Sequence, residues 1–77
     1  MYKVTIQETL VAEGNWRVVA TGTWIPGQQP QLDEQIVPGE VLEALFNVSP
    51  SVKDESGRNQ VEFGDKLYAV VFRRLSR

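Results

Sequence analysis

The sequence contains no cysteine and no histidine among its 77 residues. Their absence excludes disulfides, thiolate or imidazole metal ligands, cysteine nucleophiles and the usual general base near neutral pH. Any catalysis would depend on carboxylates, Lys, Tyr or Ser alone. We therefore predict a protein that is not an enzyme and that uses neither a cofactor nor a metal.

The sequence also lacks an excess of positive charge and any long apolar run. Its net charge is −2 and its isoelectric point about 5.0, so no overall positive field gathers phosphates. The N-terminal MYKVTIQETL alternates between polar and apolar residues and has no signal-peptide core of about 7 to 15 apolar residues. No stretch approaches the roughly 20 apolar residues that cross a bilayer. We predict no nucleic-acid partner, no membrane association and a cytoplasmic location.

What the sequence does contain is typical of a folded domain. Hydrophobic residues make up 42% and charged residues 23% of the chain. A chain of this length forms one small domain with a thin core. Residues 1–77 are therefore expected to be a single domain.

Residues 2–25 are predicted to form a β-hairpin, because polar and apolar residues alternate with one interruption at Glu13–Asn15. With those three residues as the loop, one face is polar and the other is largely apolar. A two-residue Gly14-Asn15 turn would mix the faces and is rejected. Glu8 is the exception on the apolar face, where we expect a rim residue that reaches solvent. The expected apolar face comprises Val4, Ile6, Leu10, Ala12, Trp16, Val18, Ala20, Gly22 and Trp24.

The middle of the chain divides into three predicted segments. Residues 26–37, rich in Pro and Gln, are a connector. Residues 38–48 have the apolar spacing of a short amphipathic helix, with Pro38 and Gly39 at its start. Residues 49–59 are polar and charged, which predicts a mobile loop.

Residues 60–75 fit two structures. As strands they form a hairpin around Gly64-Asp65, but the run from Tyr68 to Phe72 is then apolar on both faces. As a helix they place Val61, Gly64, Leu67, Tyr68, Val71 and Leu75 on one stripe. We favour the helix. The expected fold class is α+β, with an N-terminal hairpin covered on one face by two helices in the order ββαα.

Few side chains form candidate sites. The carboxylate pairs Asp33-Glu34 and Asp54-Glu55 lie in polar segments and are interpreted as solvated loop charges. Two tryptophans on one hairpin face either stack on a ligand or fill the core, and we favour the core. The residues expected in the core are Trp16, Trp24, Leu42, Leu45, Phe46, Leu67, Tyr68 and Val71.

The unpaired edges of the hairpin are the first candidate for binding, because such edges accept a strand from another chain. We predict a protein partner or a homodimer through the hairpin edge. The residues that carry this hypothesis are three apolar side chains on the polar face of the hairpin and a basic cluster at the C-terminal end. They are Val11, Val19, Ile25, Arg73, Arg74 and Arg77.

Three segments resemble the lead-in region of bacterial CHAT-domain proteins, which are caspase-like. The segments are GNWRVVATG, VPGEVLEALF and FGDKLYAVVF. The residues that match the family pattern are Trp16, Val18, Pro38, Leu42, Leu45, Gly64, Leu67, Tyr68, Val71 and Phe72.

The family's protease chemistry needs a His and Cys pair, and this sequence contains neither residue, so no catalytic role transfers. The resemblance implies an ancillary module of a bacterial conflict (defence) or signalling system that completes, caps or imitates a segment of a caspase-like partner. The alternative hypothesis is a small phage or mobile-element protein that acts as an inhibitor or a virion component.

Overall fold

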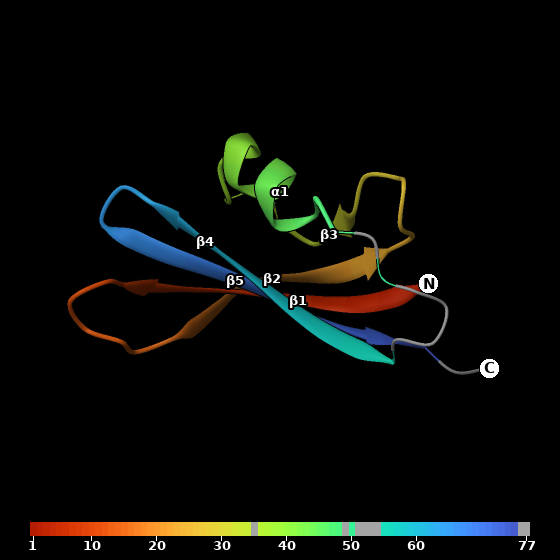
Figure 1. Ribbon diagram of the computed structural model, residues 1–77, viewed down its shortest axis with the longest axis horizontal. Coiled ribbons are helices and arrows are strands. Elements are labelled where there is room, and N and C mark those ends of the chain that lie inside the picture. The colour runs from red at the N-terminus through yellow and green to blue at the C-terminus, as the bar shows by residue number, and fades with distance from the viewer. Residues whose placement is uncertain (35, 49, 51–54, 76–77) are drawn as a thin grey trace.

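The computed structural model of the protein describes residues 1–34, 36–48, 50 and 55–75. These residues form an antiparallel sheet of five strands and one short helix (Figure 1). In chain order the elements are β1 (Tyr2–Leu10), β2 (Arg17–Trp24), β3 (Gln31–Leu32), α1 (Gly39–Leu45), β4 (Ser56–Phe63) and β5 (Lys66–Arg74).

The strand order across the sheet is β3-β2-β1-β5-β4. β1 lies in the centre and pairs with β2 on one side and with β5 on the other. The turns of the β1–β2 and β4–β5 hairpins lie at the same end of the sheet (Figure 1), where the Val11 N–H donates to the Asp65 carbonyl at 2.9 Å. The sheet is therefore two hairpins joined along β1 and β5.

Helix α1 covers one face of the sheet, which we call the inner face; the opposite face is the outer face. The core lies between α1 and the inner face. It centres on four aromatic rings, with the Trp24 centroid 5.0 Å from that of Phe46 and 5.7 Å from that of Phe72. The buried core residues are Tyr2, Val4, Ile6, Ala20, Trp24, Val37, Val41, Leu45, Tyr68, Val70 and Phe72.

The predicted hairpin exists, but a β-bulge changes its register. Tyr2 to Ile6 pair with Trp24 to Ala20, whereas Gln7 pairs with Val18, so β2 has one extra residue at Val19. Beyond the bulge, side chains of β2 change face. Trp16 therefore lies on the outer face and not in the core where we expected it, and Val19 packs against the core.

Helix α1 lies within the predicted helix 38–48 and buries Val41 and Leu45. Its C-terminal carbonyl groups are held by β4, because the Asn59 side-chain amide donates to the carbonyls of Ala44 (3.2 Å) and Leu45 (3.0 Å). Helix ends leave such carbonyls without partners inside the helix. Asn59 thus fixes a helix that is too short to be stable alone.

The second predicted helix, over residues 60–75, is wrong. These residues form the second half of β4, the turn Gly64-Asp65 and β5. Gly64 has a φ of +65°, as a type II′ turn requires at its first central position. The apolar run in β5 has a different cause from a helical stripe: β5 lies between β1 and β4, so Tyr68, Ala69 and Val70 are all buried. Val71, expected in the core, points to the outer face and is 39% exposed.

The fold class is consequently corrected from ββαα to a mainly β domain with one short helix. Two other predicted segments change with it. The connector 26–37 contains the two-residue strand β3, and Ser56–Asn59 of the predicted mobile loop begin β4, whereas residues 49 and 51–54 lie outside the described residues. Within the described part of the chain, no helix is long and apolar enough to cross a membrane.

Candidate functional site

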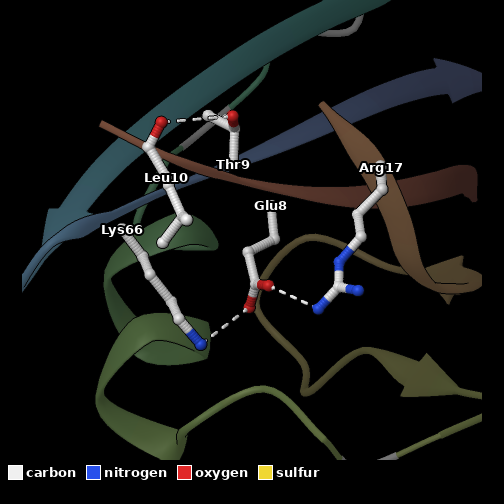
Figure 2. A network of polar contacts seen from close by, with 5 residues as sticks. All are labelled: Glu8, Thr9, Leu10, Arg17 and Lys66. Atoms are coloured by element: carbon white, nitrogen blue, oxygen red, sulfur yellow. Dashed lines mark hydrogen bonds and ion pairs between the residues drawn. The ribbon is translucent and has the colours of Figure 1, made fainter. Parts of the chain in front are cut away.

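A cluster of polar side chains surrounds Glu8 at the turn end of the inner face. Its carboxylate accepts a hydrogen bond from Arg17 at 3.0 Å and lies 3.7 Å from the Lys66 ammonium. Figure 2 shows these two cations reaching the carboxylate from opposite sides. The Tyr68 hydroxyl donates a further hydrogen bond to it. Glu8, the expected rim residue, is only 13% exposed and has charged partners on both neighbouring strands.

The surroundings of Glu8 and Tyr68 shift the pKa values of both groups away from neutral pH. Burial raises the pKa of Glu8, but hydrogen bonds from Tyr68 and Arg17 and the charges of Lys66 and Arg17 outweigh it, so the pKa lies below its ordinary value. Burial and the hydrogen bond to Glu8 raise the pKa of Tyr68 to about 12. Glu8 is therefore an anion and Tyr68 a neutral donor, and the cluster joins three strands.

A groove of about 1100 Å³ separates the β2–β3 connection from α1. At its border the Trp24 indole N–H donates to the Gln28 carbonyl at 3.0 Å, which holds the connection against the core. The exposed charges of the groove are the carboxylates of Glu40 and Glu43 on α1. No group of three or more Asp or Glu side chains that would bind a metal occurs among the described residues.

The two edges of the sheet differ. At the β2 edge, β3 pairs with Gly22 and Thr23. Next to this pairing, the Thr21 N–H and hydroxyl both donate to the Asp33 carboxylate, at 2.9 and 3.1 Å, and lower the pKa of Asp33. The remainder of the β2 edge contains the bulge at Val19. Short edge strands and bulges both hinder the addition of a further strand.

The β4 edge has neither obstruction. β4 pairs with β5 without a register shift from Ser56 to Phe63 and contains no proline. Within the described part of the chain, nothing pairs with its other side. The edge is therefore eight residues long and regular.

One hydrogen bond shows which backbone groups of β4 face outward. The Arg74 N–H donates to the Glu55 carbonyl, so Glu55 and Arg74 form a hydrogen-bonded pair. Such pairs alternate along an antiparallel ladder. The odd-numbered residues of β4 therefore bond to β5. Ser56, Arg58, Gln60 and Glu62 direct their N–H and C=O groups away from the sheet, and the Gln60 N–H has a local acceptor in the Asn59 side chain at 3.0 Å.

The side chains of β4 alternate between the two faces. Asn59 contacts α1, which places it on the inner face together with Gly57, Val61 and Phe63. Arg58 points to the outer face, where its guanidinium lies 5.3 Å from the centroid of the Trp16 ring. Phe63 is 39% exposed. The β4 edge therefore offers charged side chains on one face and apolar ones on the other.

The residues predicted to bind a partner do not form one surface. Val11 lies beyond β1 at the turn end of the sheet, Ile25 follows β2 at the opposite end, and both are exposed. Val19 is packed against the core. Arg73 and Arg74 alternate on β5, which is an internal strand, and Arg77 lies outside the described residues.

Of the residues predicted for the core, Trp24, Leu45 and Tyr68 are buried, and Leu42 and Phe46 are partly buried against them. Leu67 is half-buried on the outer face. Sequence reasoning missed the β4 edge. Its signal was the alternation from Gln60 to Phe63 followed directly by Gly64-Asp65, which is typical of a hairpin.

Comparison of the chain with protein-family models, curated proteins and solved structures gave no match.

Proposed function

We propose that this chain is a non-catalytic protein-interaction module that binds an extended segment of another polypeptide along the free edge of β4. The observation that carries this proposal is the difference between the two edges of the sheet. The β2 edge is obstructed by β3, by Asp33 and by a bulge, whereas the β4 edge is long, regular and free of proline. Proteins normally obstruct such edges, because an unobstructed one accepts a strand.

The side chains of β4 provide the means of discrimination. In strand addition, main-chain hydrogen bonds supply affinity, and side chains on alternating positions supply specificity. A bound segment would lie beside Arg58 and Glu62 on the outer face and beside Val61 and Phe63 on the inner face. A segment that alternates charged and apolar residues suits this edge.

The identity of the partner rests on the resemblance to CHAT-domain lead-in regions, which remains a prediction. It implies a caspase-like partner in a bacterial conflict or signalling system. The match over residues 64–72 was interpreted as helical, and these residues lie in the β4–β5 turn and β5. The alternative, a phage or mobile-element protein, remains open, and the neighbouring genes distinguish the two.

A pair of variants at Gln60 tests strand addition. Gln60→Pro removes an outward N–H and leaves the bonds to β5 intact, because edge strands tolerate proline where the N–H faces solvent. Gln60→Thr removes the same side chain and keeps the N–H. The immobilised wild-type protein is used to select binders from a displayed library of random peptides, and the variants are then compared.

We expect the selected peptides to bind the wild type and Gln60→Thr and to lose binding to Gln60→Pro. Circular dichroism melts must show that both variants are folded. Peptides that bind all three proteins equally, or a library that yields no binders, would contradict the proposal.

A further inference from the structure

We propose that a second copy of this chain occupies the β4 edge, with the two β4 strands antiparallel and Gln60 opposite Gln60. The inference rests on the proposed function, because it names the partner of the same edge. The symmetric arrangement joins two five-stranded sheets into one, with both α1 helices on the same face.

The geometry of antiparallel pairing restricts the register. Directly opposite residues point to the same face. The outward-directed backbone groups belong to Ser56, Arg58, Gln60 and Glu62, so these residues must form the hydrogen-bonded pairs between the copies. A two-fold axis at Gln60 satisfies this condition. The Gln60 N–H then exchanges its local acceptor, the Asn59 side chain, for the Gln60 carbonyl of the second copy.

Charge selects this register from the other symmetric ones. With Gln60 at the axis, Arg58 of each copy faces Glu62 of the other copy. The dimer then contains two Arg–Glu ion pairs. An axis at Arg58 or at Glu62 places like charges opposite each other. An axis at Asn59 or Val61 places no charge of one copy opposite a charge of the other.

The same two side chains do not pair within one copy. They are four residues apart on one strand, a distance of about 13 Å at a rise of about 3.3 Å per residue. Neither takes part in an ion pair between described residues. Within the described part of one chain Arg58 contacts the Trp16 ring but no carboxylate, and Glu62 contacts no cation, whereas the two charges match each other across a two-fold axis.

The inner face is complementary as well. The register places Phe63, an exposed ring, opposite Gly57 of the second copy. The ring of Phe72, the partner of Gly57 on β5 of the same copy, already covers Gly57, so Phe63 of the second copy would lie beside that ring. Neighbouring aromatic rings attract each other, so the inner face also favours this register.

Charge reversal at both positions tests the register. The full chain is studied by sedimentation equilibrium over a concentration series, as wild type, as Arg58→Glu, as Glu62→Arg and as an equimolar mixture of the two variants. Lys3→Glu is the matched control, because it makes the same change in charge on β1 at the centre of the sheet.

We expect the mass of the wild type to rise towards twice the 8.7 kDa of one chain. Each single variant should raise the dissociation constant about tenfold or more, because both ion pairs become repulsive. The mixture should restore association, because each variant supplies the charges that the other needs. Lys3→Glu should associate like the wild type.

A second measurement does not depend on the variants. The Arg58 and Glu62 amides point away from β5, so their hydrogen exchange should slow as the protein concentration rises. A wild type that remains at 8.7 kDa at all concentrations, or a mixture that associates no better than its components, would overturn the dimer. If peptide binding still distinguishes Gln60→Pro from Gln60→Thr in that case, the proposed function stands and only the second copy is refuted.

Discussion

Replacement of each tryptophan by alanine tests the placement of one ring in the core and the other on the outer face. Trp24 is 2% exposed and contacts the rings of Tyr2, Phe46 and Phe72. Trp16 is half-buried, and the Arg58 guanidinium lies over its ring. The two variants remove the same atoms from very different surroundings.

The expected costs differ by more than the error of the measurement. Truncation of a buried tryptophan costs about 3 to 5 kcal/mol of unfolding free energy. A domain of this size has about 4 to 12 kcal/mol in total, at about 0.05 to 0.15 kcal/mol per residue. For Trp16→Ala we expect about 1 to 2 kcal/mol, from partial burial and a cation–π contact of about 0.5 to 1 kcal/mol.

Urea unfolding followed by circular dichroism measures both costs. Each variant keeps a single tryptophan, so its fluorescence emission also reports on the remaining ring. The emission of Trp24 in the Trp16→Ala variant should be blue-shifted, and that of Trp16 in the Trp24→Ala variant should be red-shifted. If Trp24→Ala does not fold, Trp24→Phe keeps an aromatic ring and allows the comparison. Equal costs for the two alanine variants, or a more exposed spectrum for Trp24, would refute the bulge at Val19 and the placement of Trp16.

Three further predictions concern the sheet. Gly22→Ala should lower the free energy of unfolding in urea by about 1 to 3 kcal/mol, because a Cβ atom there would lie 2.0 Å from the Gln31 carbonyl oxygen. Gly39→Ala is the control, and it should be neutral or slightly stabilising because the space around Gly39 is open. The wild type should be more stable than Glu8→Gln, and this difference should be full above the ordinary Glu pKa of 4.5. The difference should shrink as pH falls through the lowered pKa of Glu8 in the folded state, and urea unfolding at pH 7 and at pH 3 measures it. Because the folded pKa of Tyr68 is raised from 10.0 to about 12, the advantage over Tyr68→Phe should be lost between these values, and an advantage unchanged at pH 12 would contradict the buried hydrogen bond to Glu8.

The first hairpin and the single helix were predictable from sequence, because their apolar spacing is determined by burial on one face. Residues from Tyr2 to Ile6 alternate cleanly, and the same alternation appears in the structure. The bulge at Val19 was not predictable, because one extra residue leaves the local pattern apolar in both registers. It moved Trp16 to the outer face and Val19 to the core.

The C-terminal hairpin was considered, but the helix was favoured over it, for two physical reasons. β5 is internal, so its run from Tyr68 to Phe72 is apolar on both faces, and the spacing of these residues also fits a helical stripe. β4 is an edge strand with polar side chains at most positions, which made its first half resemble a loop. Gly64-Asp65 was the informative signal, and it outweighs the helical spacing because a glycine with positive φ is what a two-residue hairpin turn needs.

The pairing of β1 with β5 also determines when this protein can fold during its synthesis. The register joins Tyr2 to Arg74 and Leu10 to Lys66, so the centre of the sheet consists of segments far apart in the sequence. On the ribosome, β1 and β2 emerge first, and the side of β1 that pairs with β5 remains unpaired until β5 has left the exit tunnel. Topologies dominated by such distant contacts fold slowly and expose apolar surface in the meantime. The sheet of the nascent chain therefore remains incomplete until the residues of β5 have emerged from the ribosome.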